Sequence, residues 1–231
     1  MSKRFPLTIL LTAFIATFAV SADARDLFDG IFTNHKTIHG SGTAATETRD
    51  VEPFTRISVS MGVDVFVTVG PTQQVKLTFD DNVISKIRTR VRGNSLEIDS
   101  RYSFDCDVDC RIEITVPKLE SFSLAGSGNI EIKGVNGDEF EIDVAGSGDV
   151  TIDGQVKELS IDLAGSGDID TRKLIAEDAD IDIAGSGNVQ VYATKSLNAD
   201  ISGSGDIRYY GDPENVDSDV SGSGSIRRGR G

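Results

Sequence analysis

The sequence predicts an all-β protein: a single-domain, right-handed parallel β-helix with coils of about 19 residues and a less regular N-terminal β part. The first observation behind this prediction is a repeat. The tripeptide Gly-Ser-Gly occurs seven times; the copy at 40–42 is isolated, and the other six follow at intervals of 20, 19, 20, 18 and 19 residues. A period of this length is typical of solenoid proteins, in which each repeat forms one coil.

The second observation is an alternation of apolar and polar residues on both sides of the tripeptide. The pattern before it is that of Ile142-Asp-Val144, and the pattern after it is that of Val150-Thr-Ile152. Such alternation with β-branched residues predicts half-buried strands. Each coil therefore holds two short strands, a Gly-Ser-Gly corner between them and a more variable return. Equivalent strands stack in parallel, and the handedness rule for parallel crossovers makes the helix right-handed.

The corner glycines have a steric role in this prediction. Equivalent residues of successive coils stack at about 4.8 Å, so a corner position with positive φ, or one pressed against the previous coil, admits only glycine. The small residue before each corner, such as Ala145, is expected to point inward. The Asn or Asp after it, such as Asp149, is expected to bond a nearby backbone N–H. The predicted structural corners are Gly126, Gly128, Gly146, Gly148, Gly165, Gly167, Gly185, Gly187, Gly203, Gly205, Gly222 and Gly224.

Taken in chain order, residues 1–24 are predicted to be a signal peptide. Lys3 and Arg4 form the positive start, and Leu7–Val20 is a 14-residue apolar stretch, which is short for a membrane span. The small residues of Ala22-Asp-Ala24 predict cleavage between residues 22 and 25; an uncleaved membrane anchor is the alternative. No later apolar run is long enough to span a membrane, so we expect the mature chain in the periplasm, in the cell envelope or in the medium.

The next segments lead into the repeat. Residues 25–46 are polar and unpatterned and predict an extended lead-in, and residues 47–231 form the β-helix domain. Gly93-Asn94 predicts a tight turn between two strands. The expected elements of the irregular part are strands at 57–62, 63–69 and 74–79, a helical turn at 80–86, and strands at 88–92, 95–99 and 111–116.

The only two cysteines, Cys106 and Cys110, lie between the hairpin and the last of these strands. In a straight strand they would be about 13 Å apart, too far to bridge. Because export permits disulfides, we predict a disulfide that closes a tight loop. The aspartates at 105, 107 and 109 leave a metal site as the alternative, although two thiolates without histidine are a poor ligand set.

Composition excludes several function classes. The net charge is −14, from 23 Lys and Arg and 37 Asp and Glu, which argues against nucleic acid or an anionic membrane as the main partner. There are two histidines, both near the N-terminus, so His-based triads and multi-His metal sites are not expected. Trp is absent and Tyr is rare, which disfavours a sugar-stacking platform.

One repeated position is acidic in five coils and forms the main candidate site. The position lies between two inward residues, so its carboxylates should face outward and stack with like charges about 5 Å apart. A solvated acidic face is the simpler interpretation, and a row of weak Ca²⁺ sites is the alternative, since stacked carboxylates offer hard oxygen ligands. The residues are Asp143, Asp162, Asp182, Asp200 and Asp219.

Three features together resemble the bacterial head GIN domain family, which is described as auto-transporter adhesins. They are the stretch Val51–Ser60, the stretch Ile112–Leu119 and the corners of the form Gly-Ser-Gly-Asn/Asp-Ile/Val, and the resemblance covers about residues 40 to 228. It implies an exported right-handed β-helix and an adhesive role. It transfers no catalytic or binding motif.

The sequence therefore predicts an exported, non-catalytic β-helix protein of the bacterial envelope, acting as an adhesin, a binding module or a structural module. No cofactor is expected, apart from the Ca²⁺ alternative. The expected partner is an envelope or extracellular protein or glycan, and self-association is a further option. A β-helix enzyme acting on polysaccharide is the alternative, but the short uniform coils have no long insertions to wall a cleft. The basic C-terminal end, Arg227, Arg228 and Arg230, either discourages end-to-end stacking or docks an acidic neighbour, such as another copy.

Overall fold

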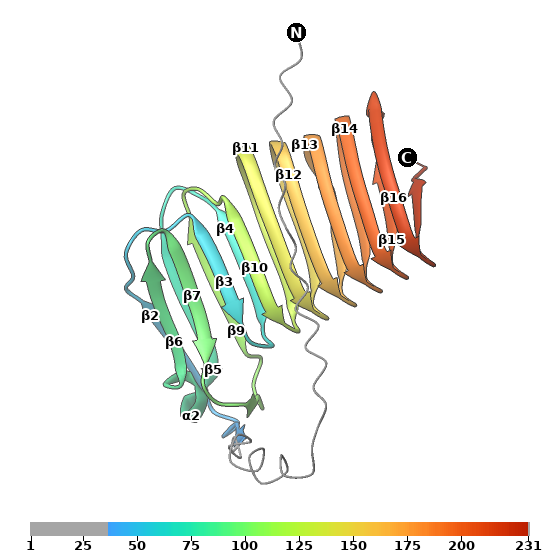
Figure 1. The fold of residues 1–231 in the computed structure, drawn as a ribbon. Coiled ribbons are helices and arrows are strands. Elements are labelled where there is room, and N and C mark those ends of the chain that lie inside the picture. The colour runs from blue at the N-terminus through green and yellow to red at the C-terminus, as the bar shows by residue number, and fades with distance from the viewer. Residues whose placement is uncertain (1–36, 231) are drawn as a thin grey trace, which may run out of the picture. The chain divides into compact units, whose positions relative to one another are not determined.

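The structure, a computed structural model, describes residues 37–230. They form a parallel β-solenoid of about 5 turns with a less regular N-terminal β region, and Figure 1 shows its strands lying side by side along the stack. The parallel β-helix predicted from the repeat is confirmed. The predicted signal peptide, residues 1–24, lies outside the described residues. In residues 37–230 the chain has no helix with the length and hydrophobicity that a membrane crossing requires.

The irregular N-terminal region contains the strands and the helical turn that the sequence predicts. Gly93, with φ 62°, closes the antiparallel hairpin of β6 and β7. β5 lies antiparallel to β2 and β9, and β4 lies parallel to β9. The elements are β1 (Ile38–His39), β2 (Ala44–Arg49), β3 (Arg56–Ser60), β4 (Asp64–Val69), β5 (Gln74–Asp80), α2 (Asp81–Ile84), β6 (Ile87–Arg92), β7 (Ser95–Ser100), β8 (Phe104–Asp105) and β9 (Arg111–Val116).

The lead-in predicted for residues 25–46 differs from the structure at its C-terminal end. Ala44 already lies in β2, which runs to Arg49 and pairs antiparallel with β5, placing Arg49 opposite Val75. Ile38 and His39 pair with β8. The folded region therefore begins before residue 47. The cause is pairing with a strand distant in sequence, which the local composition of this segment does not reveal.

The coils continue from β3 and β4 without a break. β3 pairs in parallel with β10, and β4 with β11, so the stretch 56–69 forms the first coil in chain order. β7 and β9 pair in parallel with the other sides of β3 and β4. The sequence suggested a variable return, but most of each coil is strand. A register shift between Ile132 and Val135 marks the bend in the first full coil. The strands are β10 (Ser121–Gly126), β11 (Asn129–Gly146), β12 (Asp149–Gly165), β13 (Asp168–Gly185), β14 (Asn188–Gly203), β15 (Asp206–Tyr210), β16 (Asn215–Gly222) and β17 (Ser225–Arg228).

The two glycines of each corner are required for different reasons. Gly165 has φ 143°, a conformation that side chains rarely adopt, and a Cβ there would also overlap the carbonyl oxygen of Gly146. Gly167 has no such φ, but a Cβ there would overlap the carbonyl oxygen of Gly148. At this corner the first glycine is therefore constrained by conformation and space, and the second by space alone.

The small residue before each corner faces solvent, which corrects the inward orientation expected from the sequence. Ala145, Ala164 and Ala184 are exposed, whereas Gly148 and Gly167 are buried. The strand stays extended up to the corner, so its alternation continues from inward Val144 to outward Ala145. The inward position at the corner belongs to the second glycine.

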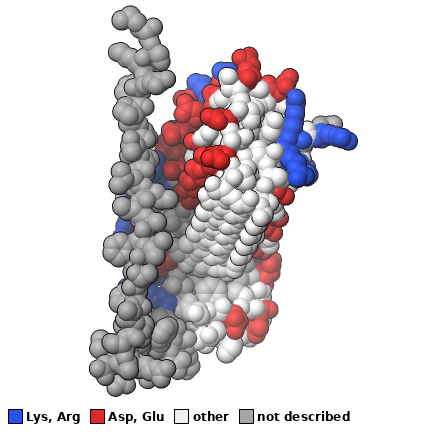
Figure 2. All heavy atoms as spheres, turned by 45° about the vertical axis from the view of Figure 1, so that its right-hand side comes forward, with Lys and Arg blue, Asp and Glu red and all other residues white. Residues whose placement is uncertain are grey.

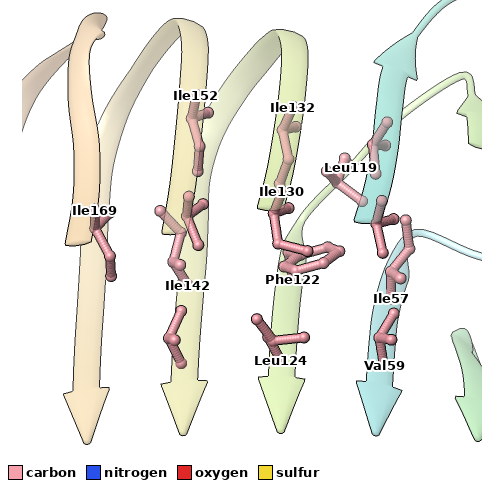
Figure 3. Packing of buried hydrophobic residues seen from close by; sticks show 14 of the residues in the cluster. Ile57, Val59, Leu119, Phe122, Leu124, Ile130, Ile132, Ile142, Ile152 and Ile169 are labelled. Atoms are coloured by element: carbon pink, nitrogen blue, oxygen red, sulfur yellow. The ribbon is translucent and has the colours of Figure 1, made fainter. Parts of the chain in front are cut away.

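The interior is filled by columns of apolar side chains. Ile57, Phe122, Ile142 and Ile161 occupy one register position in successive strands and are each at most 1% exposed. Figure 3 shows three of these side chains between neighbouring strands, with Leu124 beside them. This packing directs the alternate residues of every strand outward and so positions the acidic side chains.

Candidate functional site: the acidic face

The acidic face consists of three outward columns on the strand that precedes the corner. They alternate with the buried positions of Phe140, Ile142 and Val144 in β11, so each column follows directly from the strand alternation. Figure 2 shows Asp and Glu side chains gathered beside a regular ladder of uncharged residues. The columns contain Asp143, Asp162, Asp182, Asp200 and Asp219; then Glu141, Ser160, Asp180, Asn198 and Asp217; then Glu139, Glu158, Asp178, Ser196 and Asn215.

The first column, predicted from the repeat, is acidic in five successive coils. The register sets Asp162 directly beside Asp143 on one side and Asp182 on the other. At its N-terminal end the Ser123 hydroxyl donates a hydrogen bond to Asp143 Oδ2 at 3.0 Å. Beyond that serine, the column has no neutral residue to separate its charges.

The other two columns were not identified from the sequence, because their positions were assigned to the variable return. Both are interrupted by neutral donors: Asn198 Nδ2 donates to Asp180 Oδ1 at 2.8 Å, and the Ser196 hydroxyl donates to Asp178. The signal that could have revealed them is the shared repeat phase of the acids at 139, 158 and 178. They widen the predicted line of charge into a face.

The carboxylates of this face perturb one another. Burial, then the charges of Asp143, Glu141 and Asp180, raise the pKa of Asp162. Burial, then the charges of Asp180, Asp162 and Asp200, raise the pKa of Asp182. Both groups are partly shielded from water and surrounded by like charge, so their ionised forms are disfavoured. The face therefore holds negative charge that the fold does not neutralise.

The aspartates that follow the corners have a different role. Asp149 Oδ1 accepts a hydrogen bond from the backbone N–H of Asp168 at 3.1 Å, Asp168 Oδ1 accepts one from Asn188 at 3.2 Å, and Asn188 Oδ1 accepts one from Asp206 at 3.1 Å. The sequence indicated bonds to nearby backbone, and the structure places these donors on the next coil. This ladder uses carboxylate and amide oxygens to hold the stack together, whereas Asp162, Asp182 and Asp200 of the first column accept no side-chain hydrogen bond from the described residues.

The group of side chains with the spacing of metal ligands lies outside the acidic face. Within residues 37–230, Asp80, Cys106 and Cys110 form the only group of three acidic, Cys or His side chains whose ligand atoms all lie within 4.8 Å of one another. The two cysteines are joined in a disulfide, so they offer no thiolate. The described carboxylates of the acidic face form no such group of three, and Ca²⁺ binding there stays a prediction.

The disulfide of Cys106 and Cys110 closes a tight loop, with Cα atoms 6.2 Å apart. Sequence reasoning missed the residue that anchors this loop. Asp80 is buried and accepts hydrogen bonds from the N–H groups of Gly42, at 2.7 Å, and Asp107, at 3.1 Å. Burial raises the pKa of Asp80, but these backbone donors outweigh burial and hold the pKa below its usual value. The isolated Gly-Ser-Gly at 40–42 therefore wraps a structural carboxylate.

Comparison with solved structures finds the same fold in several bacterial proteins. A "putative adhesin" from Bacteroides fragilis NCTC 9343 is 23% identical, with a TM-score of 0.67, over 83% of this chain and 99% of that chain. A "putative adhesin" from Parabacteroides merdae ATCC 43184 is 20% identical, with a TM-score of 0.58, over 84% of this chain and 99% of the other. A "putative lipid binding protein" from Parabacteroides distasonis ATCC 8503 is 26% identical, with a TM-score of 0.52, over 84% and 100%.

Comparison with curated proteins gives no significant match. The family model described as "Putative auto-transporter adhesin, head GIN domain" matches residues 53–213, from just before β3 to the loop between β15 and β16. The match spans the first coil, the disulfide loop and five of the six repeated corners, and so includes most of the acidic face. The resemblance carried by the corner motifs is confirmed: the chain belongs to the head GIN domain family.

Proposed function

We propose that this protein is an exported, non-catalytic binding module of a bacterial cell envelope, and that its acidic face binds a basic segment of an envelope or extracellular protein. The observation that supports this most directly is the uninterrupted column from Asp143 to Asp219, which lies exposed or half-buried along the coils. A partner carrying Lys or Arg would lower the repulsion within the column, and such complementarity gives specificity and fast association.

The regularity of the face supports binding rather than catalysis. A pair of carboxylates that acts as general acid and general base requires contrasting environments, so that one is protonated and the other ionised. The pKa values of Asp162 and Asp182 are instead shifted in the same direction by the same kinds of neighbour. An array of equivalent groups suits multivalent contact with an extended partner.

The name of one structural relative raises lipid as another ligand. Drug-sized and lipid ligands usually occupy concave apolar pockets. In residues 37–230 the interior is filled by columns of side chains such as Ile142, Ile161 and Ile181, each at most 1% exposed. A surface ligand is therefore favoured over one held inside the coils.

Adhesion of coated beads tests this function. Beads carrying residues 25–231 would be washed over surfaces of mucin, of extracellular-matrix protein and of bacterial envelope fraction, with retention under flow as the measurement. We expect retention on at least one surface, and its loss at moderate salt, because screening weakens exposed charges.

A pair of variants separates the acidic face from general negative charge. Asp162→Asn/Asp182→Asn removes two carboxylates from the first column, and Glu131→Gln/Asp206→Asn removes two from the segment after the corner. The first variant should reduce retention several-fold and the second should leave it unchanged. Equal retention by both variants, or no retention on any surface, would contradict the proposal.

A further inference from the structure

The last coil leaves its inward-facing side chains uncovered by the described residues. Val216 and Val220 are 44% and 37% exposed, whereas Leu197 and Ile201, at the same positions one coil earlier, are each 2% exposed. In residues 37–230, β16 pairs with β14 alone and β17 with β15 alone. One side of each strand therefore offers free backbone N–H and C=O groups next to apolar surface, which is the usual template for adding another strand.

The two strands of this open end carry opposite charges. β16 exposes Asp217 and Asp219, and β17 exposes Arg227. Asp219 stacks on Asp200 and ends the acidic column, whereas Arg227 stacks on Arg208 and forms a basic pair on the other strand. Figure 2 shows several Lys and Arg side chains gathered at one end of the ladder. A neighbouring strand of opposite charge would therefore lower the electrostatic repulsion on each of these two strands.

We propose that this open end binds the same end of a second copy of the chain, related by a two-fold axis through Ser223. Ser223 is the exposed middle residue of the corner between β16 and β17. Because the chain runs toward the corner in β16 and away from it in β17, a half-turn about this axis lays β16 of one copy antiparallel to β17 of the other.

The sequence around the corner fits this pairing residue by residue. Asp219 and Arg227 are each four positions from Ser223, and Val220 and Ile226 are each three positions from it. Each pair therefore becomes directly opposite across the new strand contact. Opposite residues of antiparallel strands point to the same face. The ion pairs form outside, the Val220–Ile226 pairs cover the part of the core next to the corner, and two-fold symmetry makes each contact twice.

Charge reversal tests the proposed dimer, with the association constant measured by sedimentation of the full chain. Asp219→Arg alone and Arg227→Asp alone should each weaken association about tenfold or more, because two attractive pairs become repulsive. The double variant, Asp219→Arg/Arg227→Asp, should recover most of the loss. The control Asp162→Arg, in the same column three coils away, should leave association unchanged. A wild-type chain that stays monomeric at high concentration, or a dimer indifferent to all of these changes, refutes the proposal.

A cysteine at the axis provides an independent test. Ser223 would face its own counterpart at about the spacing of paired strands, a Cα separation within reach of a disulfide. Ser223→Cys should therefore form a covalent dimer on mild oxidation, whereas Ser204→Cys, at the equivalent corner one coil earlier, should not. Far-ultraviolet circular dichroism checks that both variants keep the fold. Equal crosslinking of the two variants, or crosslinking only at 204, would overturn the proposed axis.

This proposal is independent of the ligand of the acidic face. Bead retention can fail while the dimer is present, and the dimer can be absent while retention persists. Arg227→Asp lies outside the acidic face, and Asp162→Asn/Asp182→Asn lies outside the interface. These two variants, each measured in both experiments, therefore distinguish failure of the interface from failure of the proposed function.

Discussion

At the scale of single residues, the corner shows how one tripeptide meets three different demands. Gly165 adopts a conformation that other residues avoid, Ser166 faces solvent, and Gly167 turns inward against the previous coil. Because stacked corners repeat the same backbone contact, every coil requires glycine at these positions. The tripeptide therefore recurs once in each coil.

The corner argument predicts a graded response to substitution. Gly165→Val should destabilise the fold by about 3 kcal/mol or more, because it combines a disfavoured φ with overlap of the Gly146 carbonyl. Gly167→Val should also destabilise, through overlap with Gly148. Ser166→Val is the matched control at the same corner and should stay within about 0.5 kcal/mol of the wild type. Thermal unfolding measures all three. Glycine variants with the same unfolding temperature as Ser166→Val would disprove the steric account.

At the scale of elements, the strand before the corner stacks its outward acids against one another. The folded-state pKa values of Asp162 and Asp182 are raised. Such groups cost stability at pH values above the folded-state pKa, and this cost disappears as the pH falls below the unfolded-state value of about 3.9. The strand therefore retains its charge at the expense of stability.

Removing part of this charge should stabilise the chain. In low salt at pH 7, Asp162→Asn/Asp182→Asn should raise the unfolding temperature by about 2 to 4 °C, because each substitution removes like-charge neighbours. The difference from the wild type should shrink with added salt and vanish below about pH 4. Unfolding curves from pH 3 to 8 measure how this difference in unfolding temperature depends on pH. A stabilisation of the variant that grows as the pH falls would contradict the prediction.

The same variant distinguishes a solvated face from Ca²⁺ sites. For a solvated face, we expect Ca²⁺ and monovalent salt to stabilise the wild type equally at equal ionic strength, since both act by screening. A Ca²⁺-specific rise in unfolding temperature that is lost in Asp162→Asn/Asp182→Asn would instead indicate bound cations, through mass action on the folded state.

At the scale of the whole molecule, the two ends of the stack differ. At the N-terminal end, antiparallel strands and the helical turn cover the core, and Phe79, Val83 and Ile84 are at most 3% exposed. At the C-terminal end, the described residues leave Val216 and Val220 in contact with solvent. A solenoid requires polar or covered ends to avoid uncontrolled stacking, and a two-fold contact covers one end without starting a filament.

The predicted export concerns the whole chain, and it can be measured directly. When the full sequence is produced in a bacterium, we expect cleavage between residues 22 and 25, because small residues there follow the apolar stretch. Mass spectrometry of the periplasmic fraction identifies the mature N-terminus. A periplasmic product that retains Met1 would show that the segment is not a cleaved signal.

The sequence by itself determined the coils, their register and the first acidic column. The reason is that each coil repeats the same pattern, so the period alone aligns Asp143 with Asp162 and Gly146 with Gly165. The tight disulfide loop could also be predicted from the sequence. A bridge between cysteines four residues apart requires the chain to turn between them.

Only the tertiary structure decided the remaining features. The pairing of β2 with β5 and the burial of Asp80 depend on segments distant in sequence, which no local pattern reports. The outward direction of Ala145 and the width of the acidic face depend on how far the chain stays extended around each coil. The charges of Asp219 and Arg227 were visible from the start, but their place on an uncovered edge was not, because exposure of the last coil is a property of the assembled stack.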